Sequence, residues 1–109
     1  MKQIAIYGAG GFGREVACLL NKINEVKPTW ELVGFFDDGI EMGKEVSHFG
    51  KTLGGINELN AWSSELSIAF TIGDPKIVEE LVSKVTNPNI QFRTLLLQRF
   101  TSLTQRLSK

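Results

Sequence analysis

The sequence predicts an α/β fold, a small Rossmann-like parallel sheet of about four strands with helices on both faces. Three observations lead to this prediction. Strand-length apolar runs alternate along the chain with segments whose apolar residues recur at helical spacing. The first apolar run enters a glycine-rich turn, and a later run is followed by a well-marked helix start, "DPKIVEELV". Such alternation is typical of parallel sheets, because each crossover helix returns the chain to the edge where the previous strand began.

The first predicted unit is a strand, a tight turn and a helix. Lys2 to Tyr7 passes through β-branched and aromatic side chains and stops at Gly8, as a buried strand does. A helix is expected from Gly11 or Phe12 to about Asn24. Its apolar positions at helical spacing are Val16, Ala17, Leu20 and Ile23. Within this helix the single cysteine, Cys18, is expected to be a small buried side chain.

The middle of the chain predicts a second strand and a long loop. Glu31 to Phe36 forms the strand, which two aspartates close. The stretch "GIEMGKEVSHFGKTLGG" is rich in glycine and charge, and it predicts a mobile loop with one short strand near Thr52. The only histidine, His48, is expected at the surface of this loop because no carboxylate partner stands near it in the sequence. "GINELNAW" is a candidate for a short helix.

The last predicted elements are a strand, a helix and a short strand. Leu66 to Ile72 is the third strand. Asp74 is a favourable N-cap for the helix that follows, and Pro75 suits its first position. The buried stripe of this helix is Ile77, Val78, Leu81, Val82 and Val85. "TNPN" ends it, and "IQF" is the fourth strand.

Composition narrows the class of protein. The chain has 109 residues, with 12 basic and 12 acidic side chains, so no excess of positive charge points to nucleic acid or to an anionic membrane surface. No apolar run approaches the roughly 20 residues that cross a bilayer. The N-terminus lacks the apolar region of a signal peptide, and one cysteine cannot form an internal disulfide. These features predict a cytoplasmic protein with no nucleic-acid or membrane partner.

The glycine turn predicts a phosphate site. Gly8, Gly10 and Gly13 fit the pattern G-x-G-x-x-G, with Gly11 as an extra glycine. In this pattern the first glycine allows the tight turn, the second lets a pyrophosphate approach the backbone, and the third lets helix and strand pack closely. No Lys-Ser or Lys-Thr pair follows, which argues against nucleoside triphosphate hydrolysis. A turn without a ligand is the simpler alternative, and Arg14 either contacts a phosphate or is solvated.

The ends of the other two long strands carry further candidates. Asp37 and Asp38 end the second strand, where an acidic residue of a dinucleotide site binds ribose hydroxyls. They equally suit the capping of the next turn, and with no histidine or cysteine nearby they make a poor metal site. Gly73 and Asp74 follow the third strand, where Gly73 allows close backbone approach and Asp74 caps a helix. No catalytic triad or acid–base pair stands out.

Four segments together resemble a known family. "IAIYGAGGFGREVA", "WELVGFFDDG", "LGGINELNAW" and "TIGDPKI", in this order and spacing, resemble the N-terminal domain of bacterial sugar acyltransferases. The group is the sialic-acid O-acetyltransferase (PglD/NeuD-type) family, which includes UDP-sugar N-acetyltransferases. The resemblance covers about Met1 to Phe92. It implies that this domain binds a nucleotide-sugar (UDP-sugar). The implied site places Gly8, Gly10, Gly11 and Gly13 against the phosphates, Asp37 and Asp38 near uracil and ribose, and Gly73 and Asp74 at the sugar.

The end of the chain departs from the family. Members usually continue through a "NLIHPSA"-like segment into a β-helix of hexapeptide repeats, which binds acetyl-CoA and carries the catalytic histidine. Here residues 93–109 read "RTLLLQRFTSLTQRLSK", so we expect a nucleotide-sugar-binding domain over 1–92 and an atypical tail over 93–109. Leu96, Phe100, Leu103 and Leu107 fall at helical spacing, which predicts a short amphipathic helix that covers the sheet or self-associates. The resemblance implies no catalytic residue and no cofactor in this chain, with acetyl-CoA needed by the full-length family only.

Two other functions also fit the sequence. The glycine pattern and the acidic strand end also fit an NAD(P)-binding domain of a redox or sensor protein. Such a fold normally has two mononucleotide-binding halves, whereas this chain predicts about four strands. A non-catalytic interaction module with an empty crevice is the third hypothesis.

Overall fold

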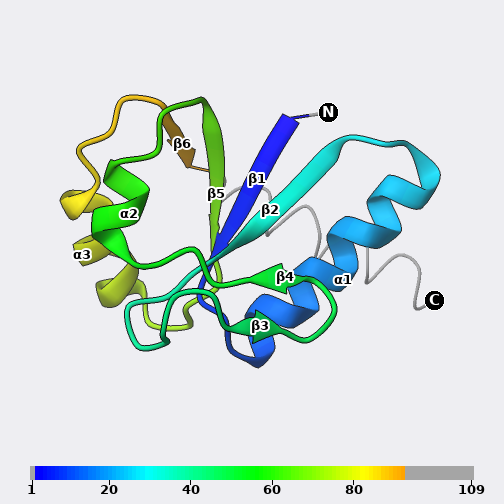
Figure 1. Cartoon of the computed structure of the whole chain (residues 1–109), viewed down its shortest axis with the longest axis horizontal. Coiled ribbons are helices and arrows are strands. Elements are labelled where there is room, and N and C mark those ends of the chain that lie inside the picture. Colours follow the sequence, from blue (N-terminus) through cyan, green and yellow to red (C-terminus); the bar gives the residue numbers. More distant parts are fainter. Residues whose placement is uncertain (1, 93–109) are drawn as a thin grey trace.

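The computed structural model describes residues 2–92, which form a four-stranded parallel sheet between layers of helices (Figure 1). The sheet has the strand order β2-β1-β5-β6. Its strands are β1 (Lys2–Tyr7), β2 (Trp30–Phe36), β5 (Leu66–Phe70) and β6 (Ile90–Phe92). Every pairing between them is parallel. The predicted fold class is therefore confirmed, while the predictions for residues 93–109 lie outside the described residues.

Two apolar clusters cover the two faces of this sheet. Helix α1 (Gly11–Val26) packs on one face together with Ile4 and Ile6. Helices α2 (Ile56–Asn60) and α3 (Pro75–Lys84) pack on the other face, with Ala5 and Tyr7. Because successive side chains of a strand point to opposite faces, the short apolar run of β1 supplies both clusters. None of the described helices is long and apolar enough to cross a membrane.

The prediction that Cys18 is buried is wrong, because its side chain is exposed. Val16 and Leu20 of the same helix are fully buried against the sheet. A residue two positions from each of them lies on the opposite side of a helix with 3.6 residues per turn. Cys18 therefore faces outward, although it stands in an apolar stretch of sequence. His48 is exposed, as predicted.

A row of aromatic rings crosses the sheet beneath its carboxyl edge, on the face of α2 and α3. Tyr7 stacks on Phe36 of β2 and on Phe70 of β5, with ring centroids 6.1 and 5.6 Å apart. Phe70 in turn stacks on Phe92 of β6 at 5.8 Å. Each pair of this kind contributes about 0.5–1.5 kcal/mol beyond the burial of its area. The row thus ties the last residues of all four strands together.

The segment after β2 contains more structure than the single short strand that the sequence predicts. Strands β3 (Glu45–Val46) and β4 (Gly50–Lys51) form an antiparallel hairpin. The chain then runs beside β2, where Thr52 forms a parallel bridge with Phe35. A Cβ on Gly34 would lie 2.7 Å from the Lys51 carbonyl oxygen, so glycine at position 34 permits this close approach. The hairpin is thereby held against the open edge of the sheet.

Candidate functional site

The candidate site lies at the carboxyl edge of the sheet, where β1 occupies a central position. β1 pairs with β2 on one side and with β5 on the other. The strand order therefore reverses next to β1, and in open parallel sheets ligands bind outside the strand ends at such a point. The predicted residues follow the three strands β1, β2 and β5. The fold thus brings all three predicted segments to one edge (Figure 1).

Two glycines of the turn after β1 are required by packing. A Cβ on Gly13 would lie 2.0 Å from the Gly8 carbonyl oxygen, closer than side chains approach. Gly8 has a φ of +119°, and a Cβ there would lie 2.6 Å from the Thr71 hydroxyl oxygen. These two positions therefore let α1 begin directly against the end of β1. They fit the turn and close-packing roles that the glycine pattern assigns to its first and third positions.

The other two glycines of the turn face open space. A Cβ on Gly10 or on Gly11 would meet no atom within 4 Å. Gly10 is the N-cap of α1 and has no side chain with which to cap the first amides of the helix. The amide groups of a first helical turn have no carbonyl partner inside the helix. The outer side of the turn therefore presents uncovered backbone donors and the positive end of the α1 dipole.

Thr71 holds this turn against β5, and it is not among the site residues predicted from the sequence. Its backbone amide donates to the Tyr7 carbonyl oxygen at 2.9 Å. Its buried hydroxyl oxygen lies 2.9 Å from the carbonyl oxygen of Gly8 and 3.2 Å from that of Tyr7, and it donates to this pair. A single threonine thus positions both the end of β1 and the first glycine. Its only signal in the sequence is a polar residue near the end of the strand predicted from Leu66 to Ile72, which in the structure ends at Phe70.

The Asp37 carboxylate joins the turn to the end of β2. One of its oxygens accepts a hydrogen bond from the Ala9 amide at 2.9 Å. The other accepts from the Gly39 amide at 2.8 Å, which closes the turn after β2. This turn-capping role is the alternative that the sequence left open. A carboxylate has about four acceptor positions, so both oxygens can still accept a further hydrogen bond.

Asp38 is engaged on the other face of the sheet. The Tyr7 hydroxyl donates to one carboxylate oxygen at 2.5 Å, and the Ile56 amide at the start of α2 donates to the other at 3.0 Å. A Cβ on Gly55 would collide with the second of these oxygens, so glycine at that position leaves room for the contact. Burial raises the pKa of the Tyr7 hydroxyl well above its usual range, and the hydrogen bond and charge of Asp38 add to this shift. Tyr7 therefore remains a neutral donor.

Gly73 and Asp74 follow β5, and both are exposed. A Cβ on Gly73 would meet no atom within 4 Å. The Asp74 side chain accepts a hydrogen bond from the Lys76 amide at 2.9 Å, and Pro75 takes the first position of α3. The predicted helix cap is thus confirmed.

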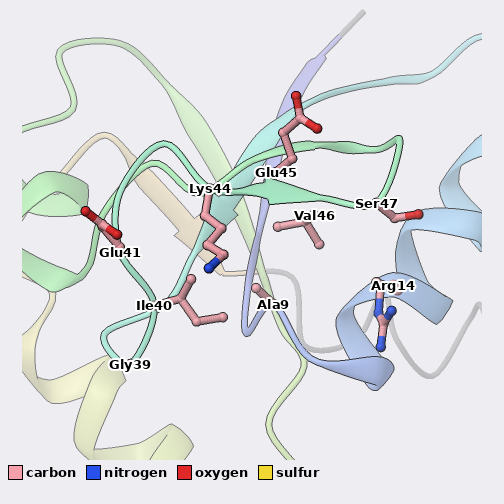
Figure 2. Close-up of a pocket in the computed structure, with 9 residues that line it drawn as sticks. All are labelled: Ala9, Arg14, Gly39, Ile40, Glu41, Lys44, Glu45, Val46 and Ser47. Atoms are coloured by element: carbon pink, nitrogen blue, oxygen red, sulfur yellow. The ribbon is translucent and has the colours of Figure 1, made fainter.

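A pocket of about 370 Å³ lies between the glycine turn and the segment after β2 (Figure 2). Its walls come from Ala9 and Arg14 on one side, and from residues 39–41 and 44–47 on the other. None of the eight predicted site residues lines it, although Ala9 and Gly39 are the two residues whose amides Asp37 binds. Arg14 is a candidate phosphate contact predicted from the sequence, whereas Lys44 is not among the predicted residues. The pocket thus forms a second part of the site, next to the glycine turn.

A buried threonine holds the wall that faces the glycine turn. Thr52 is 1% exposed. Its hydroxyl oxygen accepts a hydrogen bond from the Lys44 amide at 2.9 Å, and the same hydroxyl donates to the Glu41 carbonyl oxygen at 2.5 Å. Its own amide donates to the Lys44 carbonyl oxygen at 2.9 Å. Ser47, at the rim of the pocket, has a φ of 53°, the only positive φ of a non-glycine residue within residues 2–92.

Comparison with known proteins identifies a protein family. A family model described as the PglD N-terminal domain matches residues 3–85. The matched range includes β1, β2 and β5 with the turns that follow them, which are the three parts of the candidate site. No curated protein and no solved structure matches the chain.

Proposed function

The chain belongs to the PglD N-terminal domain family, and on this premise we propose that it binds a UDP-sugar, with the diphosphate against the glycine turn. This domain is part of the sugar acetyltransferase family, and it binds a UDP-sugar in members of the family. In this proposal the domain supplies the binding of the nucleotide-sugar acceptor. The chemistry of acyl transfer is not assigned to any residue described above.

The observation that supports the proposal is that packing explains only two of the four glycines in the turn. Gly8 and Gly13 are explained by packing, because a Cβ at either position would collide with neighbouring atoms. Packing within residues 2–92 gives no such reason for Gly10 and Gly11, which face open space. Side chains at these two positions would, however, stand between a phosphate and the first amides of α1. A bound diphosphate accounts for glycine at both of them.

The neighbouring pocket suits the nucleoside. Its volume of about 370 Å³ falls within the range of small-molecule sites. Ala9, Ile40 and Val46 give it an apolar lining that can pack against a base. The Asp37 carboxylate is fixed by two backbone amides beside this pocket, and its free acceptor positions can take ribose hydroxyls. Asp38 then acts by holding Tyr7 and the start of α2 in place.

The remaining predicted residues fit the far side of the ligand. Gly73 and Asp74 follow β5, the strand next to β1 on the side away from the pocket. Because Gly73 has open space at its Cβ position, it allows the close approach of a sugar beyond the diphosphate. The nucleoside would therefore lie over β2, the diphosphate over β1 and the sugar toward β5.

Isothermal titration calorimetry with UDP, UDP-N-acetylglucosamine and NADH tests this function. We expect both uridine nucleotides to bind, and NADH to bind more weakly. Tighter binding of NADH than of UDP would favour the NAD(P)-binding alternative. Absence of heat with both uridine nucleotides at millimolar concentration would overturn the proposal.

A further inference from the structure

We propose that Arg14 and Lys44 form a cation pair that makes the site selective for a diphosphate-linked ligand over a nucleoside or a nucleoside monophosphate. This inference rests on the proposed function, because it assigns the residues that recognise the diphosphate of the ligand. The two cations belong to separate elements. Arg14 lies in the first turn of α1, and Lys44 lies in the segment that leads into β3.

The two side chains lie on either side of the glycine turn. Both line the pocket, and Figure 2 shows them flanking Ala9, the residue between the first two glycines of the pattern. The Lys44 ammonium group is directed toward Ala9 and Ile40. The Arg14 guanidinium group lies over the start of α1. A ligand seated on the turn would therefore have one cation on each side.

The charges of this cation pair are uncompensated in the described part of the chain. Within residues 2–92 neither Arg14 nor Lys44 forms an ion pair or a side-chain hydrogen bond, and both side chains are exposed. Two carboxylates also line the pocket, but Figure 2 shows that Glu45 points away from the glycine turn and that Glu41 lies at the far end. The free positive charges can therefore pair with the phosphates of a ligand seated on the glycine turn beside the pocket.

The backbone that carries Lys44 is held in place before any ligand binds. Thr52 contacts both sides of this residue, because its hydroxyl oxygen accepts from the Lys44 amide and its amide donates to the Lys44 carbonyl oxygen, each at 2.9 Å. Arg14 is fixed in the same way by the helix, where its amide donates to the Gly10 carbonyl oxygen at 3.1 Å. Only the two side chains then need to be ordered on binding, which lowers its entropic cost.

The number of cations matches the charge of the linkage. A nucleotide-sugar carries one negative charge on each of its two phosphates. A lysine binds a phosphate as a point charge, and an arginine can bind one with two parallel hydrogen bonds. One cation on each side of the turn therefore serves one phosphate each. A monophosphate places its charge at one position and can satisfy only one of the two.

The test measures the affinities of UDP, UMP and uridine for the wild type and for matched variants by calorimetry. Lys44→Gln and Arg14→Gln each remove one charge of the cation pair, and Lys44→Arg retains it. Lys51→Gln and Lys22→Gln are controls, because both lysines are exposed and neither lines the pocket. Thermal unfolding of each variant confirms that it is folded.

We expect Lys44→Gln and Arg14→Gln each to weaken UDP binding about tenfold or more, the size expected of one lost charge-assisted hydrogen bond. Uridine affinity should change less than about twofold, and the double variant should lose most of the preference for UDP over UMP. Lys44→Arg and the two controls should stay within about threefold of the wild type. Raised ionic strength should weaken UDP binding in the wild type more than in the double variant.

Three results would overturn the cation pair. If the wild type binds UDP and both single variants bind it equally well, the inference fails while the proposed function stands. If uridine affinity falls as much as UDP affinity, the two residues contact the nucleoside and do not read the linkage. If the wild type binds neither UDP nor UDP-N-acetylglucosamine, the proposed function and the cation pair fall together.

Discussion

Replacing Gly13 with alanine should destabilise the fold by pushing α1 away from β1. The new Cβ would stand 2.0 Å from the Gly8 carbonyl oxygen, whereas side-chain carbons do not approach other atoms closer than 3.0 Å. Helix and turn must therefore separate by about 1 Å. The obstacle is a backbone carbonyl of a turn that Thr71 and Asp37 hold, so it cannot rotate aside. Overpacking of this kind costs about 2–3 kcal/mol.

The same substitution at Gly10 and Gly11 supplies matched controls. Because a Cβ at either position has open space, we expect Gly11→Ala to leave stability unchanged or to raise it by up to about 1 kcal/mol. Gly10→Ala should cost at most about 1 kcal/mol, because Gly10 is the N-cap of α1 and glycine is preferred over alanine there. The effect of both variants should appear in UDP affinity, since the added methyl group stands in the way of a phosphate. Gly13→Ala is thus expected to change stability, and the other two variants to change binding.

Thermal unfolding followed by far-UV circular dichroism measures the first effect. A loss of 2–3 kcal/mol should lower the melting temperature by roughly 10–20 °C in a domain of this size. Calorimetry with UDP measures the second. A Gly13→Ala protein that melts with the wild type would refute the packing argument. A Gly10→Ala protein as unstable as Gly13→Ala would refute the open space at the turn.

Three further substitutions test other contacts of the fold. The free energy of unfolding should fall as pH rises above about 10, because an unfolded tyrosine ionises there while Tyr7 keeps its proton in the fold. In urea titrations at increasing pH, Tyr7→Phe should make this fall less steep. An equally steep fall in the variant would contradict the raised pKa of the Tyr7 hydroxyl. Thr52→Val should lower the free energy of unfolding in urea by about 1–3 kcal/mol and speed hydrogen exchange of the Lys44 amide. Unchanged exchange would show that the Thr52 hydroxyl does not hold this segment. Asn87→Ala should lower the free energy of unfolding by about 2–3 kcal/mol, because the buried side-chain amide donates to the Leu59 and Trp62 carbonyl oxygens at 3.1 and 2.8 Å. Asn89→Ala, at an exposed position, is the control in the same unfolding assay.

Elements with a strong periodic pattern could be predicted closely in extent, whereas the prediction that Ile77 is buried is wrong, because its side chain is 43% exposed. The helix predicted from Gly11 or Phe12 to about Asn24 runs to Val26, and the strand predicted from Glu31 begins one residue earlier, at Trp30. The N-cap at Asp74 is confirmed because capping depends on neighbours in the chain. The hairpin after β2 could not be predicted in this way. Its two-residue strands are too short to show a period, and its hold on β2 depends on Gly34, which comes earlier in the chain.

In the candidate site, too, local features could be predicted and contacts between distant segments could not. The glycine turn could be recognised from its spacing, since the roles of Gly8 and Gly13 follow from how one strand enters one helix. Thr71, Thr52 and Lys44 could not be assigned to the site in advance. Thr71 acts on residues 63 and 64 positions earlier, and Thr52 acts on Lys44 across a hairpin. Contacts of this kind leave no periodic trace in the sequence.

By itself the sequence determined the strand–helix order, the parallel sheet and the turn that can face a phosphate, because these depend on local periodicity and on backbone conformation. Only the tertiary structure decided what the polar residues at the strand ends touch. In the structure, Asp37 accepts hydrogen bonds from the amides of Ala9 and Gly39, whereas Asp38 accepts one from the Tyr7 hydroxyl on the opposite face of the sheet. The tertiary structure also brought Lys44 to the pocket that Arg14 lines. The physical reason is that adjacent residues after a strand diverge to different faces, and which partner each one meets depends on the packing of distant segments.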